Sequence, residues 1–181
     1  MHNFEKQEIT NTNLDTLIKS FSGLADDWML VTSGTGLTRQ EWNTMTAAWG
    51  GFGILWNIPV AHVYIRPTRH TLNFTENNDY MTLSFFNPKC EKMKDALKFC
   101  GTKSGRDFDK AKETGLKPMM LQTRAIGFEQ AETIIVCRKI YTDYIKPECF
   151  LDQSIISDKY PLKDFHKFYV CEITALYKAE K

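Results

Sequence analysis

Short strand-like runs separated by residues that stop strands are the feature that most constrains how this chain folds. Apolar and β-branched residues fill six runs, at 28–33, 44–49, 60–65, 80–86, 131–140 and 168–177. Glycine, proline or asparagine follows most of these runs, and such residues end strands. Many short strands need their edges paired. We therefore predict a β-rich α+β fold, a small barrel with short helices in the crossovers.

Helical spacing of apolar residues appears between these runs. It predicts one helix at 13–21 and another at 91–100, with shorter helices at 71–77 and 107–114. Residues 1–24 are expected to form an N-terminal helical extension of a single domain that spans 1–181.

Two local signals refine this picture. Ser104 is placed to cap the helix predicted at 107–114. Gly50, Gly51 and Gly53 break the second strand, which predicts a mobile loop that Pro59 closes.

Composition excludes several classes of function. The 23 basic and 22 acidic residues give a formal net charge of +1, so a general nucleic-acid-binding face is not expected. The sequence has no run of 18 apolar residues, and its first six residues lack the order of a signal peptide, so neither a membrane span nor secretion is expected. The five scattered cysteines show no Cys-x-x-Cys or zinc-type spacing. They indicate reduced thiols in a cytoplasmic protein without a metal site.

Two neighbouring segments carry the residue types that an anion needs. Thr46 and Thr68 offer hydroxyl groups, and Arg66 and Arg69 offer charged, forked donors. The side chains of 46–48 are short, so a flat ring can lie close to the main chain. This combination predicts a phosphorylated, planar ligand rather than a metal or a proton-transfer pair.

The chain resembles the flavin reductase-like family with the FMN-binding split-barrel fold, in particular its flavoredoxin-like branch. Ordered segments between about Trp28 and Tyr177 carry the resemblance. They are DWMLVT at 27–32, NTMTAAWG at 43–50, LWNIPV at 55–60, VYIRPTR at 63–69, TLSFF at 82–86, CGTKSGRD at 100–107, DK at 109–110 and PECF at 147–150.

The resemblance implies a homodimer with FMN in a cleft at or near the dimer interface. It also implies four groups of FMN-binding residues. Those along the isoalloxazine and ribityl chain are Met45, Thr46, Ala47 and Trp49, and those at the phosphate are Arg66, Pro67, Thr68 and Arg69. Those flanking the ring or ribityl are Ser84, Phe85 and Phe86, and those completing the site are Cys100, Gly101, Ser104, Gly105 and Lys110.

The leading hypothesis is a flavin reductase that takes a hydride from NADH or NADPH and passes electrons to free flavin or another acceptor. The alternative is a non-enzymatic, flavoredoxin-like electron carrier with tightly bound FMN, reduced by a protein partner. A cleft that holds haem or another small molecule, and a purely structural role, remain further alternatives. Because the flavin supplies the redox chemistry, no catalytic side chain is predicted.

Each candidate residue also has an ordinary structural explanation. Arg66 and Arg69 can be solvated charges at a strand end, and Ser104 can serve as a cap alone. Cys100 can simply pack in the core, as buried cysteines commonly do. The aromatic residues Trp49, Phe52 and Trp56 suit a lid over the flavin, but they also suit ordinary core packing. His62 and His166 are either proton donors or satisfied polar groups.

Overall fold

The computed structural model describes residues 3–10, 23–121 and 123–180, so the helix predicted at 13–21 lies outside the described residues. The strands are β1 (Phe4–Gln7), β2 (Met29–Gly34), β3 (Trp42–Ala47), β4 (Gly50–Leu55), β5 (Ile58–Ile65), β6 (Tyr80–Phe85), β7 (Pro118–Met120), β8 (Ile126–Phe128), β9 (Thr133–Tyr144) and β10 (Lys167–Ala179). The helices are α3 (Thr71–Glu76), α4 (Glu91–Thr102), α5 (Lys110–Thr114) and α6 (Ser154–Lys159), with short helical turns at Gly23–Asp27 and Pro147–Cys149.

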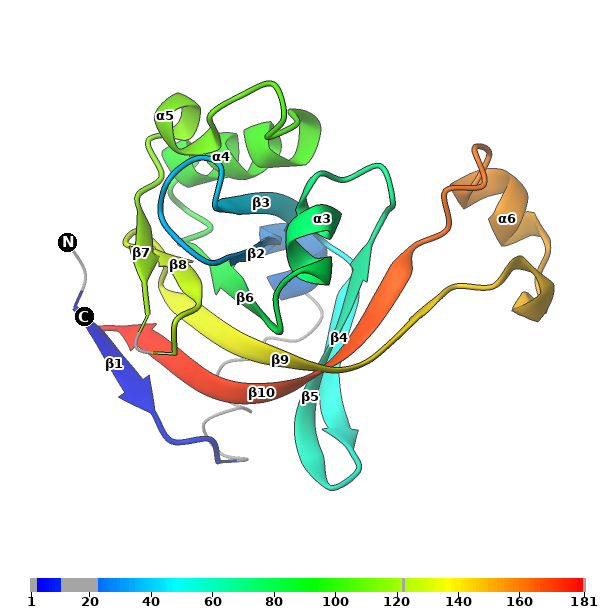
Figure 1. Cartoon of the computed structure of the whole chain (residues 1–181), viewed down its shortest axis with the longest axis horizontal. Coiled ribbons are helices and arrows are strands. Elements are labelled where there is room, and N and C mark those ends of the chain that lie inside the picture. The colour runs from blue at the N-terminus through cyan, green and yellow to red at the C-terminus, as the bar shows by residue number, and fades with distance from the viewer. Residues whose placement is uncertain (1–2, 11–22, 122, 181) are drawn as a thin grey trace.

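One curved antiparallel sheet organises the described part of the chain (Figure 1). Its strand order is β3-β2-β6-β9-β10-β5-β4, and β1 pairs with the far end of β10. The strands β7 and β8 form a separate small ribbon. The segment with α6 projects from the sheet between β9 and β10, while α4 and α5 lie together beside β3 (Figure 1).

Alternation along the strands divides the buried side chains between two core clusters. In β9, Ile135 and Cys137 belong to the first cluster, and Ile134 and Val136 belong to the second. The first cluster fills the inside of the curved sheet. The second lies between the outer face of the sheet and α4, which contributes Leu97 among others. Fully burying an aliphatic side chain contributes about 1.5–3 kcal/mol, so both clusters stabilise the fold.

The predicted strands at 28–33, 44–49, 60–65, 80–86, 131–140 and 168–177 are present, with ends shifted by a few residues. The helices at 71–77 and 91–100 are present as α3 and α4. Three short strands and α6 escaped prediction because they are too brief to show a periodic pattern. Residues 4–7 were expected to be part of a helical extension, but they form β1.

The predicted mobile loop at 50–59 is wrong, because this segment forms β4 and a hairpin turn into β5. Trp56 and Asn57 both adopt left-handed backbone conformations, with φ of 52° and 59°, as a tight hairpin turn requires. A Cβ on Gly50 would lie 2.8 Å from the backbone oxygen of His62. Glycine therefore permits a close strand approach here, rather than breaking the strand.

The helix predicted at 107–114 is shorter than expected, since α5 begins at Lys110. Its cap is Asp109, whose carboxylate accepts a hydrogen bond from the Lys112 backbone N–H at 3.1 Å. Ser104 instead closes the preceding turn, where its hydroxyl accepts from the Arg106 N–H at 3.2 Å. The prediction of Ser104 as a helix cap is therefore wrong.

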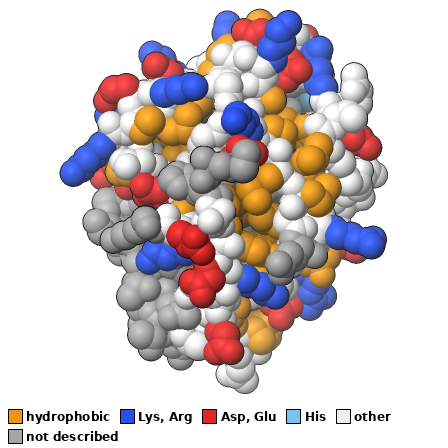
Figure 2. All heavy atoms as spheres, turned by 90° about the vertical axis from the view of Figure 1, so that its left-hand side faces the viewer, with side chains coloured by type: hydrophobic (Ala, Val, Ile, Leu, Met, Phe, Trp, Pro, Cys, Tyr) orange, Lys and Arg blue, Asp and Glu red, His pale blue; other side chains and the backbone are white. Residues whose placement is uncertain are grey.

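The surface mixes charges of both signs. Figure 2 shows acidic and basic side chains interspersed around a central band of hydrophobic side chains on one face. No helix in the described ranges is both long enough and apolar enough to cross a membrane.

Candidate functional site

Two adjoining pockets lie beside the ends of β3 and β5. The first, here called the aromatic pocket, has a volume of about 250 Å³ and is lined by Met45, Thr46, Ala47, Ala48, Trp49, Tyr64, Arg66, Arg69 and His166. The second, here called the polar pocket, has a volume of about 210 Å³ and is lined by Asn43, Met45, Thr68, Arg69, His70, Thr71, Thr102, Lys103, Ser104, Gly105 and Lys110. Met45 and Arg69 line both pockets, so the two form one elongated site.

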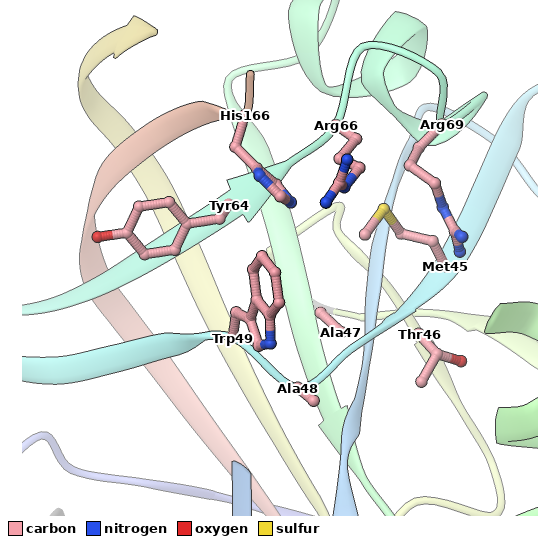
Figure 3. Close-up of a pocket in the computed structure, with 9 residues that line it drawn as sticks. All are labelled: Met45, Thr46, Ala47, Ala48, Trp49, Tyr64, Arg66, Arg69 and His166. Carbon is pink, nitrogen blue, oxygen red and sulfur yellow. The ribbon is translucent and has the colours of Figure 1, made fainter. Parts of the chain in front are cut away.

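Short and aromatic side chains shape the aromatic pocket (Figure 3). Ala47 and Ala48 keep its floor close to the main chain where β3 ends. Trp49 is 48% exposed, and its ring centroid lies 5.1 Å from that of His166. Tyr64, on β5, adds a further aromatic wall. Such a slot suits a flat, aromatic ligand.

His166 is held in this wall by Tyr160. The Tyr160 hydroxyl and the His166 Nδ1 atom are 2.9 Å apart. Burial and the nearby Arg66 charge lower the pKa of His166 to about 4. The imidazole is therefore neutral at neutral pH, and it offers a hydrogen-bonding group without adding charge.

Arg66 interacts with the segment that precedes His166. Its guanidinium donates to Asp164 Oδ2 at 2.6 Å and to the Lys159 carbonyl oxygen at 2.8 Å. It also lies over the Tyr160 ring, 5.1 Å from the ring centroid. These contacts direct the donors of Arg66 towards 159–164.

Arg69 lies on the other side of Met45 (Figure 3). It donates to the carbonyl oxygens of Gly101 at 2.6 Å and Cys100 at 3.1 Å, and Thr46 donates to that of Leu97 at 2.5 Å. The Cys100 and Gly101 oxygens belong to the last turn of α4, where helix carbonyls lack partners within the helix and favour a nearby cation. The contacts account for two of the five N–H donors of Arg69.

Lys110 is a second cation at the polar pocket and is only 5% exposed. Its Nζ donates to the carbonyl oxygens of Thr44 at 2.6 Å and Cys100 at 3.2 Å. Burial, aided by the Arg69 charge, lowers the pKa of Lys110 to about 8. The residues found to line either pocket include no carboxylate. An anion in the polar pocket would therefore supply the missing countercharge.

The chain passes unusually close to Asn43 at Gly105. A Cβ on Gly105 would lie 1.9 Å from Asn43 Oδ1, so a side chain there would displace Asn43. Asn43 in turn donates to Thr71 Oγ1 at 2.8 Å. This packing holds the 102–105 turn, with its hydroxyl groups, against the polar pocket.

Most of the predicted site residues come together in the two pockets. These are Met45, Thr46, Ala47, Trp49, Arg66, Thr68, Arg69, Ser104, Gly105 and Lys110. Cys100 and Gly101 lie behind the pockets and supply the carbonyl oxygens that Arg69 contacts. Pro67 lies between Arg66 and Thr68 in the sequence but lines neither pocket.

The group predicted at 84–86 lies elsewhere. Ser84 is fully buried in β6, and Phe86 belongs to the second core cluster. Phe85 packs against the first cluster, with its ring 6.4 Å from that of Phe52. These three residues line neither pocket, so the site proposed below does not include them.

The predicted binding set lacks three residues that line the aromatic pocket, Ala48, Tyr64 and His166, although His166 was considered as a proton donor. It also lacks five that line the polar pocket, Asn43, His70, Thr71, Thr102 and Lys103. Side chains two residues apart on a strand point to the same face of the sheet, so Tyr64 could have been predicted to lie on the same side as Arg66. His166 directly precedes β10, whose first residue, Lys167, pairs with Ile65. That pairing between segments about 100 residues apart could not be read from one sequence.

Other chemistries find less support. The described residues include no group of three or more His, Cys, Asp or Glu side chains suited to a metal ion. Burial raises the pKa of the Cys100 thiol to about 11, so this thiol stays protonated and is a poor nucleophile.

Comparison with known proteins identifies the fold. A search of solved structures found an FMN-binding domain of a flavin reductase-like enzyme from Shewanella baltica, with a TM-score of 0.63 and 15% identity, covering 98% of this chain and 78% of that one. Flavoredoxin from Methanosarcina acetivorans gives a TM-score of 0.63 and 18% identity, covering 97% and 76%. An NADH:FAD oxidoreductase from Streptomyces globisporus gives 0.62 and 11%, covering 96% and 89%. No family model matches the chain, and no curated protein matches it.

The curved sheet and the similar structures together define the class. The chain has the split-barrel fold of the FMN-binding, flavin reductase-like proteins. This confirms the fold expected from the ordered sequence segments.

Proposed function

We propose that this protein binds FMN, with the phosphate in the polar pocket and the isoalloxazine ring in the aromatic pocket. The observation that carries the proposal is a pair of cations, the half-buried Arg69 and the buried Lys110, next to an aromatic slot and without a lining carboxylate. Hydroxyl groups of Thr68 and Ser104 add neutral donors for phosphate oxygens. The aromatic and alanine walls suit a planar ring.

We further propose an oxidoreductase that takes a hydride from NADH or NADPH. Two of the similar structures bear the names flavin reductase-like enzyme and NADH:FAD oxidoreductase, which supports this class. The bound flavin would supply the hydride chemistry. The protein's own part is to orient the ring against Trp49 and to exclude water with Tyr64 and His166.

The second candidate is an electron carrier that a partner protein reduces. The similarity to a protein named flavoredoxin favours it. Steady-state oxidation of NADH or NADPH by the purified protein separates the two functions. Rapid turnover with free flavin as acceptor supports the reductase, whereas turnover that appears only with a partner protein supports the carrier.

The visible absorbance spectrum of the purified protein tests FMN binding. We expect flavin bands, either as purified or after addition of FMN and gel filtration, and release of FMN on denaturation. A protein that retains no flavin after incubation with FMN would contradict the proposed function.

We also propose that the protein is a cytoplasmic homodimer. All five cysteines are free thiols, which supports a reducing compartment. Ile54, Leu151 and Leu162 have exposed fractions of 62%, 103% and 81%, and contact between chains would remove such apolar groups from water. Light scattering should give twice the 21.0 kDa of one chain. A monomer across the micromolar range would contradict the dimer.

A further inference from the structure

The segment 145–166 leaves the sheet and contributes one residue, His166, to the lining of the aromatic pocket. It runs out from β9, carries α6 and returns at His166, immediately before β10 (Figure 1). Its aromatic side chains pack on one another, with the Tyr160 and Phe165 rings stacked 4.7 Å apart. The position of His166 in the pocket therefore depends on how this segment is fastened to the barrel.

Arg66, which follows β5, connects this segment to the barrel. It contacts Asp164, the Lys159 carbonyl and the Tyr160 ring, and so spans most of the return path of the segment. The ion pair is partly shielded, with side-chain exposures of 27% for Arg66 and 13% for Asp164. The Tyr160 hydroxyl in turn forms a hydrogen bond with His166 Nδ1. A continuous chain of contacts thus connects Arg66 to the pocket wall.

Arg69 has different surroundings, although it lies only three residues away. Arg69 lines the polar pocket with Thr68 and Lys110, whereas Arg66 lines only the aromatic pocket. Figure 3 shows Met45 between the two guanidinium groups. The two arginines therefore face different parts of the elongated site.

We propose that Arg66 is a positioning residue for the flavin ring, which acts by holding 159–166 in place, while Arg69 serves the phosphate. This inference rests on the proposed FMN binding and divides a role that the sequence assigned to both arginines. It predicts that the charge of Arg66 matters through Asp164 rather than through the ligand.

The phosphate separates the two roles experimentally, because riboflavin has the ring of FMN without it. Binding of FMN and riboflavin is measured by fluorescence titration for the wild type and for R66Q, D164N and R69Q, after circular dichroism has confirmed the fold of each variant. R66Q and D164N should weaken both flavins by the same factor, at least about fivefold. R69Q should weaken FMN and spare riboflavin.

Two additional readouts separate positioning from general loss of structure. The R66Q/D164N double variant should bind no more weakly than either single variant, because both changes break one ion pair. R66K should restore part of the riboflavin affinity, since it keeps the charge opposite Asp164. The visible circular dichroism of bound riboflavin should change in R66Q and D164N and remain unchanged in R69Q.

Failure of the inference is distinct from failure of the proposed function. A wild-type protein that binds neither flavin overturns FMN binding itself. A wild type that binds both flavins, with R66Q losing FMN alone, makes Arg66 a phosphate ligand and overturns the inference. Normal riboflavin binding by D164N also overturns it.

Discussion

Lys110 is a buried cation that donates to two backbone carbonyl oxygens. Its lowered pKa makes the stability of the protein depend on pH. Between about pH 8 and the ordinary value of 10.5, the folded, ligand-free protein releases a proton that the unfolded chain keeps. The stability of the ligand-free protein should therefore rise with pH in this window, as far as Lys110 contributes. A bound phosphate would instead raise the pKa of Lys110, because its negative charge favours the charged ammonium.

We accordingly predict that FMN affinity falls as pH rises from about 7.5 to 9.5, by at most about tenfold per pH unit for one proton. Riboflavin affinity should stay nearly constant over the same range, because riboflavin lacks the phosphate. Titration of both flavins across this range provides the measurement. K110M is the control, and it should abolish the difference between the two pH profiles. Parallel profiles for both flavins in the wild type would contradict a phosphate beside Lys110.

Gly105 and Gly51 offer a matched pair of substitutions. An added Cβ at Gly105 collides with Asn43, whereas at Gly51 it meets no atom within 4 Å. Gly105→Ala should therefore lower the free energy of unfolding by about 1–3 kcal/mol and weaken FMN binding. Gly51→Ala should change stability by no more than about 0.5 kcal/mol. Urea unfolding of both variants tests this, and equal effects would show that Asn43 can move aside.

At the scale of elements, the turn between β4 and β5 combines a strained backbone with an unsuitable residue. Trp56 is 59% exposed and has a φ of 52°, which a bulky side chain adopts at a cost. Trp56→Asn should raise the free energy of unfolding by about 1 kcal/mol, or the unfolding midpoint by about 2–4 °C. Trp56→Phe keeps the strain and should give no gain. A loss of stability in Trp56→Asn would indicate that the indole packs against another surface.

The strands β4, β5 and β6 show which strands can be predicted from the sequence and which cannot. Runs such as 60–65 and 80–86 have clear β-type composition, so their strands could be predicted. The glycines of β4 give no such signal, because the pairing of β4 with β5 depends on a neighbour across the sheet. For the same reason, Ser84 and Phe85 could be placed on a strand, but the sequence did not show that they line neither pocket.

The candidate site likewise contains some residues that could be grouped from the sequence and others that could not. Residues close together in the sequence, at 45–49 and 66–69, could be grouped from their chemistry alone. The distant partners of Arg66 and the contribution of His166 arise from the 145–166 segment, whose fold has no periodic signal. The sequence thus grouped most of the residues that line the two pockets but assigned the two arginines the same role.

At the scale of the whole molecule, the pockets draw residues from β3, β5, α3, α4 and α5, and from His166 just before β10. A ligand that contacts all of them binds only the folded chain, and it should stabilise the protein by about 2.7 kcal/mol at 100 times its dissociation constant. We predict that FMN raises the thermal midpoint by about 5–10 °C at this concentration. Riboflavin at the same concentration should raise it less. Differential scanning fluorimetry of the R69Q variant should show a smaller difference between the shifts for the two flavins than in the wild type, and no shift with FMN in the wild type would contradict binding.

The long strands β9 and β10 contribute side chains to both core clusters, with neighbouring residues pointing in opposite directions. Neither cluster can therefore loosen while the other keeps its packing, because both depend on the same backbone ladder. The barrel interior and the helical layer should melt in one cooperative transition. Amide protons in the middle of β9 and β10 should exchange with solvent only through global unfolding. The strand pair that separates the two cores also makes them a single thermodynamic unit.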